Sequence, residues 1–156
     1  MKRIKLNKKH KNKDSNRWLN RHLNDEYVRK SKIDGYRSRS SYKLIQINEK
    51  YDFLKNSFKI VDLGCSPGGW LQVVRELSPR SSKVIGFDLI SLKEIPDIKF
   101  YKIDVNESEI FEKIDSFFEK KKIDFIDKSL SRSKQSNIRR IIKKSGKPRG
   151  AVIAIA

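Results

Sequence analysis

The amino-acid sequence predicts an α/β fold in which a parallel sheet is flanked by helices. Short apolar stretches alternate with helix-like stretches between residues 58 and 126. The first apolar stretch ends in a glycine-rich turn, and each of the next two ends in an acidic residue. Strands that alternate with helices along a chain are typical of parallel sheets.

The N-terminal third divides into an arm and a helical segment. Residues 1–14 are basic, poor in apolar side chains and without periodicity, which predicts a disordered arm. Ser15 is a candidate N-cap for a helix that Asp34-Gly35 ends, with apolar positions at Trp18, Leu19, Leu23, Tyr27 and Val28. A second helix is expected from about Ser40 to Asn48.

The central elements follow in order. The patterns predict strands at 58–63, 84–88, 98–104 and 123–126, with helices at about 70–77 and 110–118. After Ile126 the pattern stops, and residues 127–156 predict a basic, divergent tail with a weak helix across 135–145. The final Ala-Val-Ile-Ala-Ile-Ala predicts a strand. Because that strand ends with the chain, we expect the C-terminal part of the sheet to be incomplete.

Charge is distributed unevenly along the 156 residues, whose net charge is +18. Residues 1–13 contribute +7 and 128–156 contribute +9, both without an acid, whereas 44–127 carry −2. Basic regions around a near-neutral body favour a polyanion partner, with nucleic acid the first candidate. The alternative is compositional bias of an A+T-rich genome, which would not explain the uneven placement.

Several classes of protein are disfavoured by composition. No apolar run is long enough to cross a bilayer, and the N-terminus lacks the apolar stretch of a secretory signal. The single cysteine excludes a disulfide framework and a multi-cysteine zinc site, and the two histidines have no evident ligand partners. The sequence therefore predicts a cytoplasmic protein without a metal site.

The most informative stretch is residues 61–70, Val-Asp-Leu-Gly-Cys-Ser-Pro-Gly-Gly-Trp. Glycines between a strand and a helix let the backbone approach a ligand, and ligands of open α/β sheets bind beyond the carboxyl ends of the strands. Asp88 follows Gly68 by 20 residues and ends the next strand, where an acid accepts hydrogen bonds from ribose hydroxyls. The spacing also fits a nicotinamide cofactor, but the turn lacks the G-x-G-x-x-G pattern and holds a proline. The phosphate-binding lysine of a P-loop is absent as well.

The segment DLGCSPGGW resembles the first motif of methyltransferases that use S-adenosylmethionine (SAM), in the form typical of the FtsJ/RrmJ family. The resemblance extends upstream through Gly35-Tyr36-Arg37-Ser38-Arg39 and Tyr42-Lys43-Leu44, and downstream through Asp104 and residues 123–126. It implies a Rossmann-like methyltransferase sheet and 2′-O-ribose methylation of a uridine in large-subunit (23S) ribosomal RNA. Residues 15–57 would then be an RNA-facing helical segment, and 58–126 the SAM-binding core.

The resemblance also implies roles for individual residues. Gly68 and Trp70 match turn residues around the methionine part of SAM, Asp88 would hold the ribose, and Asp104 the adenine amino group. Lys43 matches the first lysine of the family's Lys-Asp-Lys-Glu catalytic set. An ammonium there lowers the cost of the negative charge that develops on an attacking ribose hydroxyl. Cys65 is interpreted as a small packing residue.

The last part of the chain departs from the family pattern. Ser129 stands where the family's catalytic Asp is expected, and Asp127 lies two positions earlier. The second lysine would fall at Ile155, and the glutamate region has no counterpart. These departures support an alternative function, in which a frame-shifted or truncated family member has lost catalysis and retains only RNA binding.

Overall fold

The computed structural model describes residues 25–119, 125–128 and 152–154, the last two ranges as backbone alone. Within them lie helices α2 (Glu26–Ile33), α3 (Ser41–Tyr51), α4 (Gly69–Leu77) and α5 (Glu109–Phe117), and the short 3-10 helix η1 (Leu54–Asn56). The strands are β1 (Lys59–Leu63), β2 (Lys83–Asp88), β3 (Ile98–Lys102), β4 (Phe125–Lys128) and β5 (Val152–Ala154). The predicted arm, Ser15, Trp18, Ser129 and Ile155 lie outside the described residues.

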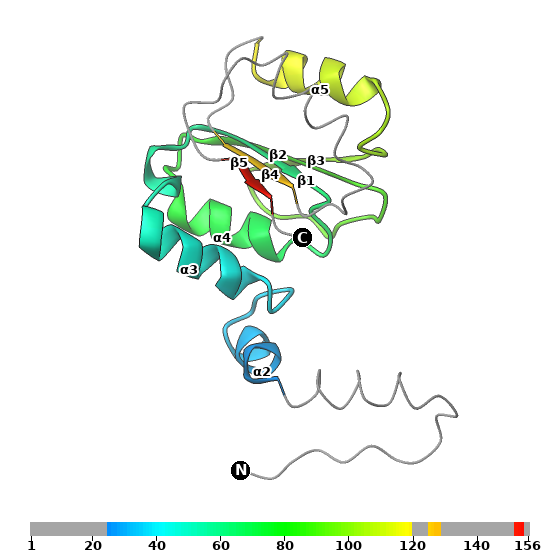
Figure 1. The fold of residues 1–156 in the computed structure, drawn as a ribbon. Helices are drawn as coiled ribbons and strands as arrows, with labels where there is room; N and C mark the ends of the chain where they lie inside the picture. The colour runs from blue at the N-terminus through cyan, green and yellow to red at the C-terminus, as the bar shows by residue number, and fades with distance from the viewer. Residues whose placement is uncertain (1–24, 120–124, 129–151, 155–156) are drawn as a thin grey trace, which may run out of the picture.

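The strands form one parallel sheet in the order β3-β2-β1-β4-β5, which confirms the predicted α/β class. Figure 1 shows α5 on one face of the sheet and α3 and α4 on the other. Since all strands run the same way, their carboxyl ends lie along one edge. The turn after β1 and the acid that ends β2 therefore meet at that edge.

Alternate residues of the two central strands supply two separate cores. Val61, Leu63, Ile85 and Phe87 pack with α5, together with Ile110, Phe111, Ile114 and Phe118. Ile60 and Val84 pack on the opposite face with residues of α3 and α4, including Leu44, Trp70, Leu71, Val73 and Val74. A strand buried on both faces reads as a continuous apolar run, which is why the sequence predicted β1 and β2 closely.

β3 lies at the edge of the sheet and is less buried than the strands beside it. Its exposed side chains include Lys99 and Lys102, the kind of charged residue that prevents an open edge from pairing with another chain. The prediction for this strand ran to Asp104, but the strand ends at Lys102. Asp104 instead begins a turn, because its carboxylate accepts the main-chain N–H of Asn106 at 2.9 Å.

The first predicted helix is wrong in one respect, because the chain is not helical at Asp25. That residue is extended, with φ −70° and ψ 122°, and its carboxylate accepts the N–H groups of Tyr27 and Val28 as the N-cap of α2. Burial favours a raised pKa for Asp25, but the ion pair with Arg39 and the two N–H groups hold that pKa below its ordinary value. The predicted end at Asp34-Gly35 is confirmed.

Two other boundaries differ from the prediction. α3 continues to Tyr51, past the predicted end at Asn48, and ends where Asp52 adopts φ +45°. Its last turn is largely exposed, so no apolar periodicity marks it. β4 extends past Ile126 to Lys128, because β1 on one side and β5 on the other pair with its backbone regardless of side-chain polarity. The predicted C-terminal strand is confirmed at Val152–Ala154.

Candidate functional site at the carboxyl edge of the sheet

The turn that follows β1 is fastened to the end of β2 by main-chain hydrogen bonds. The N–H groups of Gly64 and Cys65 both donate to the carbonyl of Phe87, at 2.8 and 3.3 Å. One residue further, the N–H of Ser66 donates to Asp88 Oδ2 at 2.8 Å. The predicted glycine turn and the predicted ribose-binding acid are therefore direct neighbours in space.

Two independent features of the structure favour glycine at position 68. Its φ of +100° lies in the left-handed region, which side chains other than glycine rarely adopt. A Cβ on Gly68 would also lie 2.8 Å from Leu92 Cδ1, 3.0 Å from Arg37 Nη1 and 3.1 Å from Ile95 Cδ1. The backbone of the turn is thus packed beneath the loop 89–97, which leads from β2 to β3.

Gly69 begins α4 and permits close contact with the start of α3. A Cβ there would lie 2.3 Å from Ser38 Oγ and 2.6 Å from Ser41 Oγ, so the two segments touch where only hydrogen fits. The Ser41 hydroxyl donates to the Gly69 carbonyl at 3.0 Å, a buried hydrogen bond. The glycine pair therefore shapes the turn on one side and locates α3 on the other.

Asp88 accepts two main-chain hydrogen bonds and has accepting capacity beyond them. Oδ2 accepts from the Ser66 N–H and Oδ1 from the Ile90 N–H, both at 2.8 Å. An ionised carboxylate has about four lone-pair sites, so two backbone donors leave room for two hydroxyls. The side chain is half-buried, and the adjoining Leu89 and Ile90 are exposed, which offers apolar surface beside the acid.

Asp104 lies beyond β3, the next strand along this edge. Its Oδ1 accepts both the main-chain N–H and the side-chain amide of Asn106, at 2.9 and 2.8 Å. Within the described part of the chain, no hydrogen bond is made to Oδ2. The half-buried carboxylate can therefore accept a hydrogen bond from an amino group of a ligand.

Trp70 has a packing role that the resemblance did not indicate. The indole is 7% exposed in the α4 core, and its Nε1 donates to the Ser40 carbonyl at 2.9 Å. This bond adds to the Ser41–Gly69 bond in joining α4 to the start of α3. The predicted contact of Trp70 with a cofactor stays a prediction.

Lys43 lies in the first turn of α3, two residues after the Ser41 that contacts Gly69. Its side chain is exposed, whereas its neighbours Tyr42 and Leu44 are buried. The start of this helix is tied to the glycine turn through Ser41, and the catalytic role of Lys43 stays a prediction. Cys65 is buried with Sγ close to Gly86, in agreement with its interpretation as a packing residue.

Arg37 makes contacts at this edge that no pattern in the sequence indicated. Its guanidinium donates to the carbonyls of Lys93, Glu94 and Pro67, at 2.6, 2.9 and 3.4 Å. Arg37 was included in the resemblance only as a member of the Gly35–Arg39 stretch. No local pattern would distinguish it from Arg39, which instead pairs with Asp25.

β4 brings Asp127 to a position within the sheet. Asp127 pairs in register with Asp62 of β1, and Lys128 pairs with Leu63, the last residue of that strand. Asp127 therefore belongs to the strand itself. Ser129, the position at which the family's Asp was expected, lies outside the described residues.

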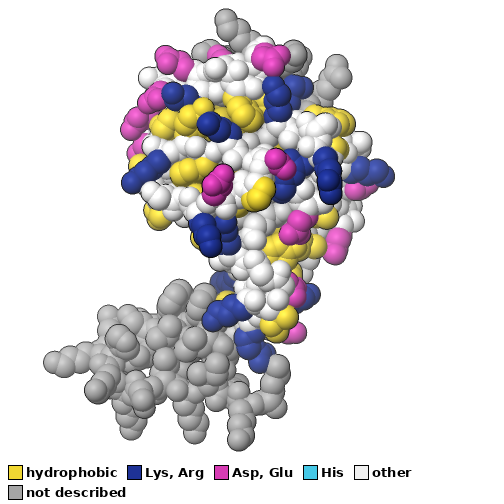
Figure 2. All heavy atoms as spheres, turned by 180° about the vertical axis from the view of Figure 1, so that it is seen from behind, with side chains coloured by type: hydrophobic (Ala, Val, Ile, Leu, Met, Phe, Trp, Pro, Cys, Tyr) yellow, Lys and Arg dark blue, Asp and Glu magenta, His cyan; other side chains and the backbone are white. Residues whose placement is uncertain are grey.

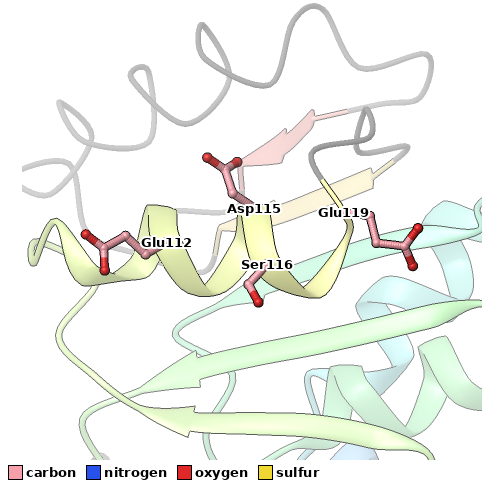
Figure 3. Close-up of a pocket in the computed structure, with 4 residues that line it drawn as sticks. All are labelled: Glu112, Asp115, Ser116 and Glu119. Carbon is pink, nitrogen blue, oxygen red and sulfur yellow. The ribbon is translucent and has the colours of Figure 1, made fainter.

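A separate open hollow of about 550 Å³ lies along α5 and includes none of the predicted site residues. Figure 3 shows its lining residues Glu112, Asp115, Ser116 and Glu119, whose side chains point in different directions. Across the described ranges, no three His, Cys, Asp or Glu side chains are grouped as metal ligands.

The surface of the core carries charges of both signs. Figure 2 shows Lys and Arg side chains interspersed with Asp and Glu over the face seen from behind. This mixture agrees with the near-neutral charge of residues 44–127. None of the helices in the described ranges has the length and apolarity needed to cross a membrane.

Comparison with known proteins agrees with this geometry. The model of the family described as FtsJ-like methyltransferase matches residues 36–144. The match includes the glycine turn, Lys43, Asp88 and Asp104, and it continues past Ile126. The chain belongs to the FtsJ-like methyltransferase family.

Curated relatives carry the name ribosomal RNA large subunit methyltransferase E. The protein of Bartonella tribocorum is 50% identical over 93 residues, which are 58% of this chain and 38% of the relative. That of Coxiella burnetii strain RSA 331 is 42% identical over 107 residues, 69% of this chain and 50% of the relative. The chain thus spans half the length, or less, of these two relatives.

A solved structure shows the same fold. The crystal structure of a Plasmodium falciparum protein assigned as a ribosomal RNA methyltransferase superimposes with a TM-score of 0.62 at 29% sequence identity. The superposition covers 70% of this chain and 72% of that one. The Rossmann-like methyltransferase fold implied by the sequence motif is therefore confirmed.

Proposed function

We propose that this chain is a SAM-dependent methyltransferase that acts on the ribose 2′-hydroxyl of a uridine in large-subunit (23S) ribosomal RNA in the cytoplasm. One observation carries the proposal: a glycine turn that accepts no Cβ lies directly beside a carboxylate with free accepting capacity, within the residues of the family match. The names of the curated relatives support ribosomal RNA of the large subunit as the substrate.

The residues of the edge fit SAM. Gly68 adopts the left-handed backbone that the tight turn needs, and its missing Cβ makes room for Leu92, Ile95 and Arg37 of the same chain. Asp88 would accept the hydroxyls of a ribose and Asp104 an amino group, because each carboxylate keeps accepting sites beyond its hydrogen bonds within the chain. SAM supplies an activated methyl group.

Lys43 has the chemistry to assist the nucleophile. A ribose hydroxyl is a weak nucleophile at neutral pH, because its pKa is far above 7. An ammonium beside the attacking oxygen stabilises the negative charge that develops there. The contacts of Ser40 and Ser41 with α4 hold the start of the Lys43 helix against the turn, which supplies the orientation that such a transfer needs.

RNA would approach from the side of α2 and α3. Lys30, Lys32 and Lys43 are exposed on these two helices. Figure 1 shows that α3 lies beside α4 and that α2 extends from it, away from the sheet. A backbone of phosphates that spans these lysines would bring a ribose to the glycine turn.

Lys43→Ala tests the proposal, with Lys50→Ala as a matched control. Lys50 is exposed on the same helix, and seven residues of α-helix return it to nearly the same face. The assay measures transfer of tritiated methyl groups from SAM to undermethylated large ribosomal subunits. We expect Lys43→Ala to reduce turnover on the order of 100-fold, as the loss of an electrostatic contact to the reacting oxygen does. Equal effects of the two substitutions would contradict the role of Lys43.

A second function is favoured by the register of β4. Asp127 is part of the strand, and Ser129, two residues further on, stands where the family's Asp is expected. A family member without this acid would bind RNA without transferring methyl groups. Wild-type chain that binds ribosomal RNA with an affinity that falls steeply with salt, and yet transfers no methyl group, would establish this second function.

A further inference from the structure

Arg37 lies between α2 and α3, and its main chain is fixed to α4. The N–H of Arg37 donates to Gln72 Oε1 at 2.8 Å, and Gln72 Nε2 donates to the Gly35 carbonyl at 3.0 Å. The same amide group therefore holds the residues on both sides of Tyr36. Arg37 projects from a point that cannot shift without breaking these two bonds.

The guanidinium joins two loops that are distant in the sequence. It donates to Lys93 O and Glu94 O in the loop 89–97, and to Pro67 O in the glycine turn. The planar fork of an arginine can reach several carbonyls at once, which an ammonium cannot do in the same geometry. One side chain thus links the N-terminal segment, the turn after β1 and the loop after β2.

The loop that Arg37 holds has little regular structure of its own. Residues 89–97 contain no helix or strand, and Leu89 and Ile90 are exposed. Leu92, Ile95 and Arg37 Nη1 all converge on the position that a Cβ of Gly68 would occupy. The loop therefore lies against the turn at Gly68, where the turn has no side chain.

We propose that Arg37 is a positioning residue that clamps the loop 89–97 onto the glycine turn and thereby sets the shape of the cofactor site. The effect on cofactor binding rests on the proposed SAM-dependent function. The clamp itself rests only on the hydrogen bonds of Arg37 and on the packing around Gly68.

Arg75 provides a matched control on the same face of the sheet. Its guanidinium also donates to two carbonyls, Pro79 O at 2.6 Å and Ser82 O at 3.2 Å, and it is half-buried like Arg37. It lies near the other end of α4, at the loop that enters β2. Arg75→Met therefore removes a similar set of bonds away from the proposed site.

The experiment compares Arg37→Met, Arg37→Lys and Arg75→Met with the wild-type chain. Hydrogen exchange of the backbone amides in residues 89–97 measures the clamp without any ligand, and isothermal titration measures SAM affinity. We expect Arg37→Met to raise exchange in the loop and to weaken SAM binding by about tenfold, with partial recovery in Arg37→Lys. Arg75→Met should raise exchange in residues 78–82 and change SAM affinity less than about twofold.

The two readouts separate the clamp from the proposed function. If Arg37→Met exchanges faster in the loop but the wild-type chain binds no SAM, the clamp is supported and the proposed SAM binding is overturned. Unchanged exchange in the loop of Arg37→Met would overturn the clamp. An increase in loop exchange in Arg75→Met as large as that in Arg37→Met would overturn it as well. Faster exchange with undiminished SAM affinity would overturn the link between the clamp and the cofactor site.

Discussion

The indole Nε1 of Trp70 donates a hydrogen bond of 2.9 Å to the main-chain carbonyl of Ser40. Trp70 is in the first turn of the helix that leaves the glycine turn, and Ser40 is the N-cap of the helix that bears Lys43. The bond therefore joins the helix that follows the glycine turn to the helix that bears Lys43. It makes the position of Lys43 depend on the packing of α4.

Trp70→Phe should destabilise the protein and loosen this connection. The substitution removes the donor and part of a buried ring, and we expect a loss of about 1–3 kcal/mol in the free energy of unfolding. Urea denaturation measures it. The companion variant Ser41→Ala removes the neighbouring bond to Gly69. If the losses of unfolding free energy in the two single variants do not add up to the loss in the double variant, the two bonds are coupled. A neutral Trp70→Phe would show that the indole N–H contributes nothing.

Gly68→Ala should be more costly than Gly35→Ala. Both glycines have positive φ, +100° and +77°, so both substitutions introduce backbone strain on the order of 1 kcal/mol. A Cβ at Gly35 meets nothing within 4 Å, whereas one at Gly68 meets three atoms at 3.1 Å or less. The difference in unfolding free energy between the variants isolates the contact with Arg37, Leu92 and Ile95. Equal losses of unfolding free energy in the two variants would show that Arg37, Leu92 and Ile95 shift to make room for the Cβ without destabilising the protein.

Asp88→Asn and Asp104→Asn compare how much the two carboxylates contribute to the stability of the fold. Asp88 accepts from the backbone of two loops, whereas Asp104, among the residues that the structure describes, accepts only from Asn106, two residues away. We expect Asp88→Asn to lower the unfolding free energy by about 1–3 kcal/mol and Asp104→Asn by less. Thermal denaturation at fixed pH measures both. A larger loss for Asp104→Asn would contradict the assignment of Asp88 as the residue that joins the loops.

Stability should fall in alkaline solution through Tyr42. Burial and the hydrogen bond to Asp34 Oδ2, 2.6 Å long, raise the pKa of Tyr42 to about 12. Because the folded pKa exceeds the ordinary value of 10.0, the stabilisation is complete below pH 10 and is lost as the pH rises toward 12. Burial and Glu76 also raise the pKa of Tyr36, so the wild-type curve alone does not isolate Tyr42.

Tyr42→Phe serves as the reference for that measurement. The difference in unfolding free energy between wild type and Tyr42→Phe should be constant below pH 10 and shrink between pH 10 and 12. Chemical denaturation at a series of pH values gives the difference directly. A difference that stays constant across this interval would show that Tyr42 ionises equally in the folded and unfolded chain.

The elements that sequence analysis predicted well are those whose signal is local. β1, β2 and α4 fall within a residue or so of their predicted bounds, because buried strands and an amphipathic helix leave an apolar pattern in adjacent residues. Sequence also indicated that Gly68 and Asp88 would lie near each other, because parallel strands bring their carboxyl ends to one edge. The family motif then predicted the chemistry of that edge.

Polar contacts and strand pairing lay beyond the reach of such patterns. Apolar periodicity is absent at three places where the prediction and the structure differ: the N-cap Asp25, the polar residues Asp127 and Lys128 of β4, and the exposed last turn of α3. The pairing of β4 depends on β1 and β5, which are distant in the sequence. Backbone hydrogen bonds between strands form whatever side chains the paired residues have, so the residue types of β4 do not reveal the pairing.

The sequence by itself determined the α/β class, the glycine turn and the acids at the strand ends, since each is written in neighbouring residues. Only the tertiary structure decided that Trp70 fastens the Lys43 helix and that Arg37 holds the loop 89–97 on Gly68. Both side chains bind main-chain carbonyls, which every residue possesses. Their partners are therefore selected by position in space, and no residue type in the sequence identifies them.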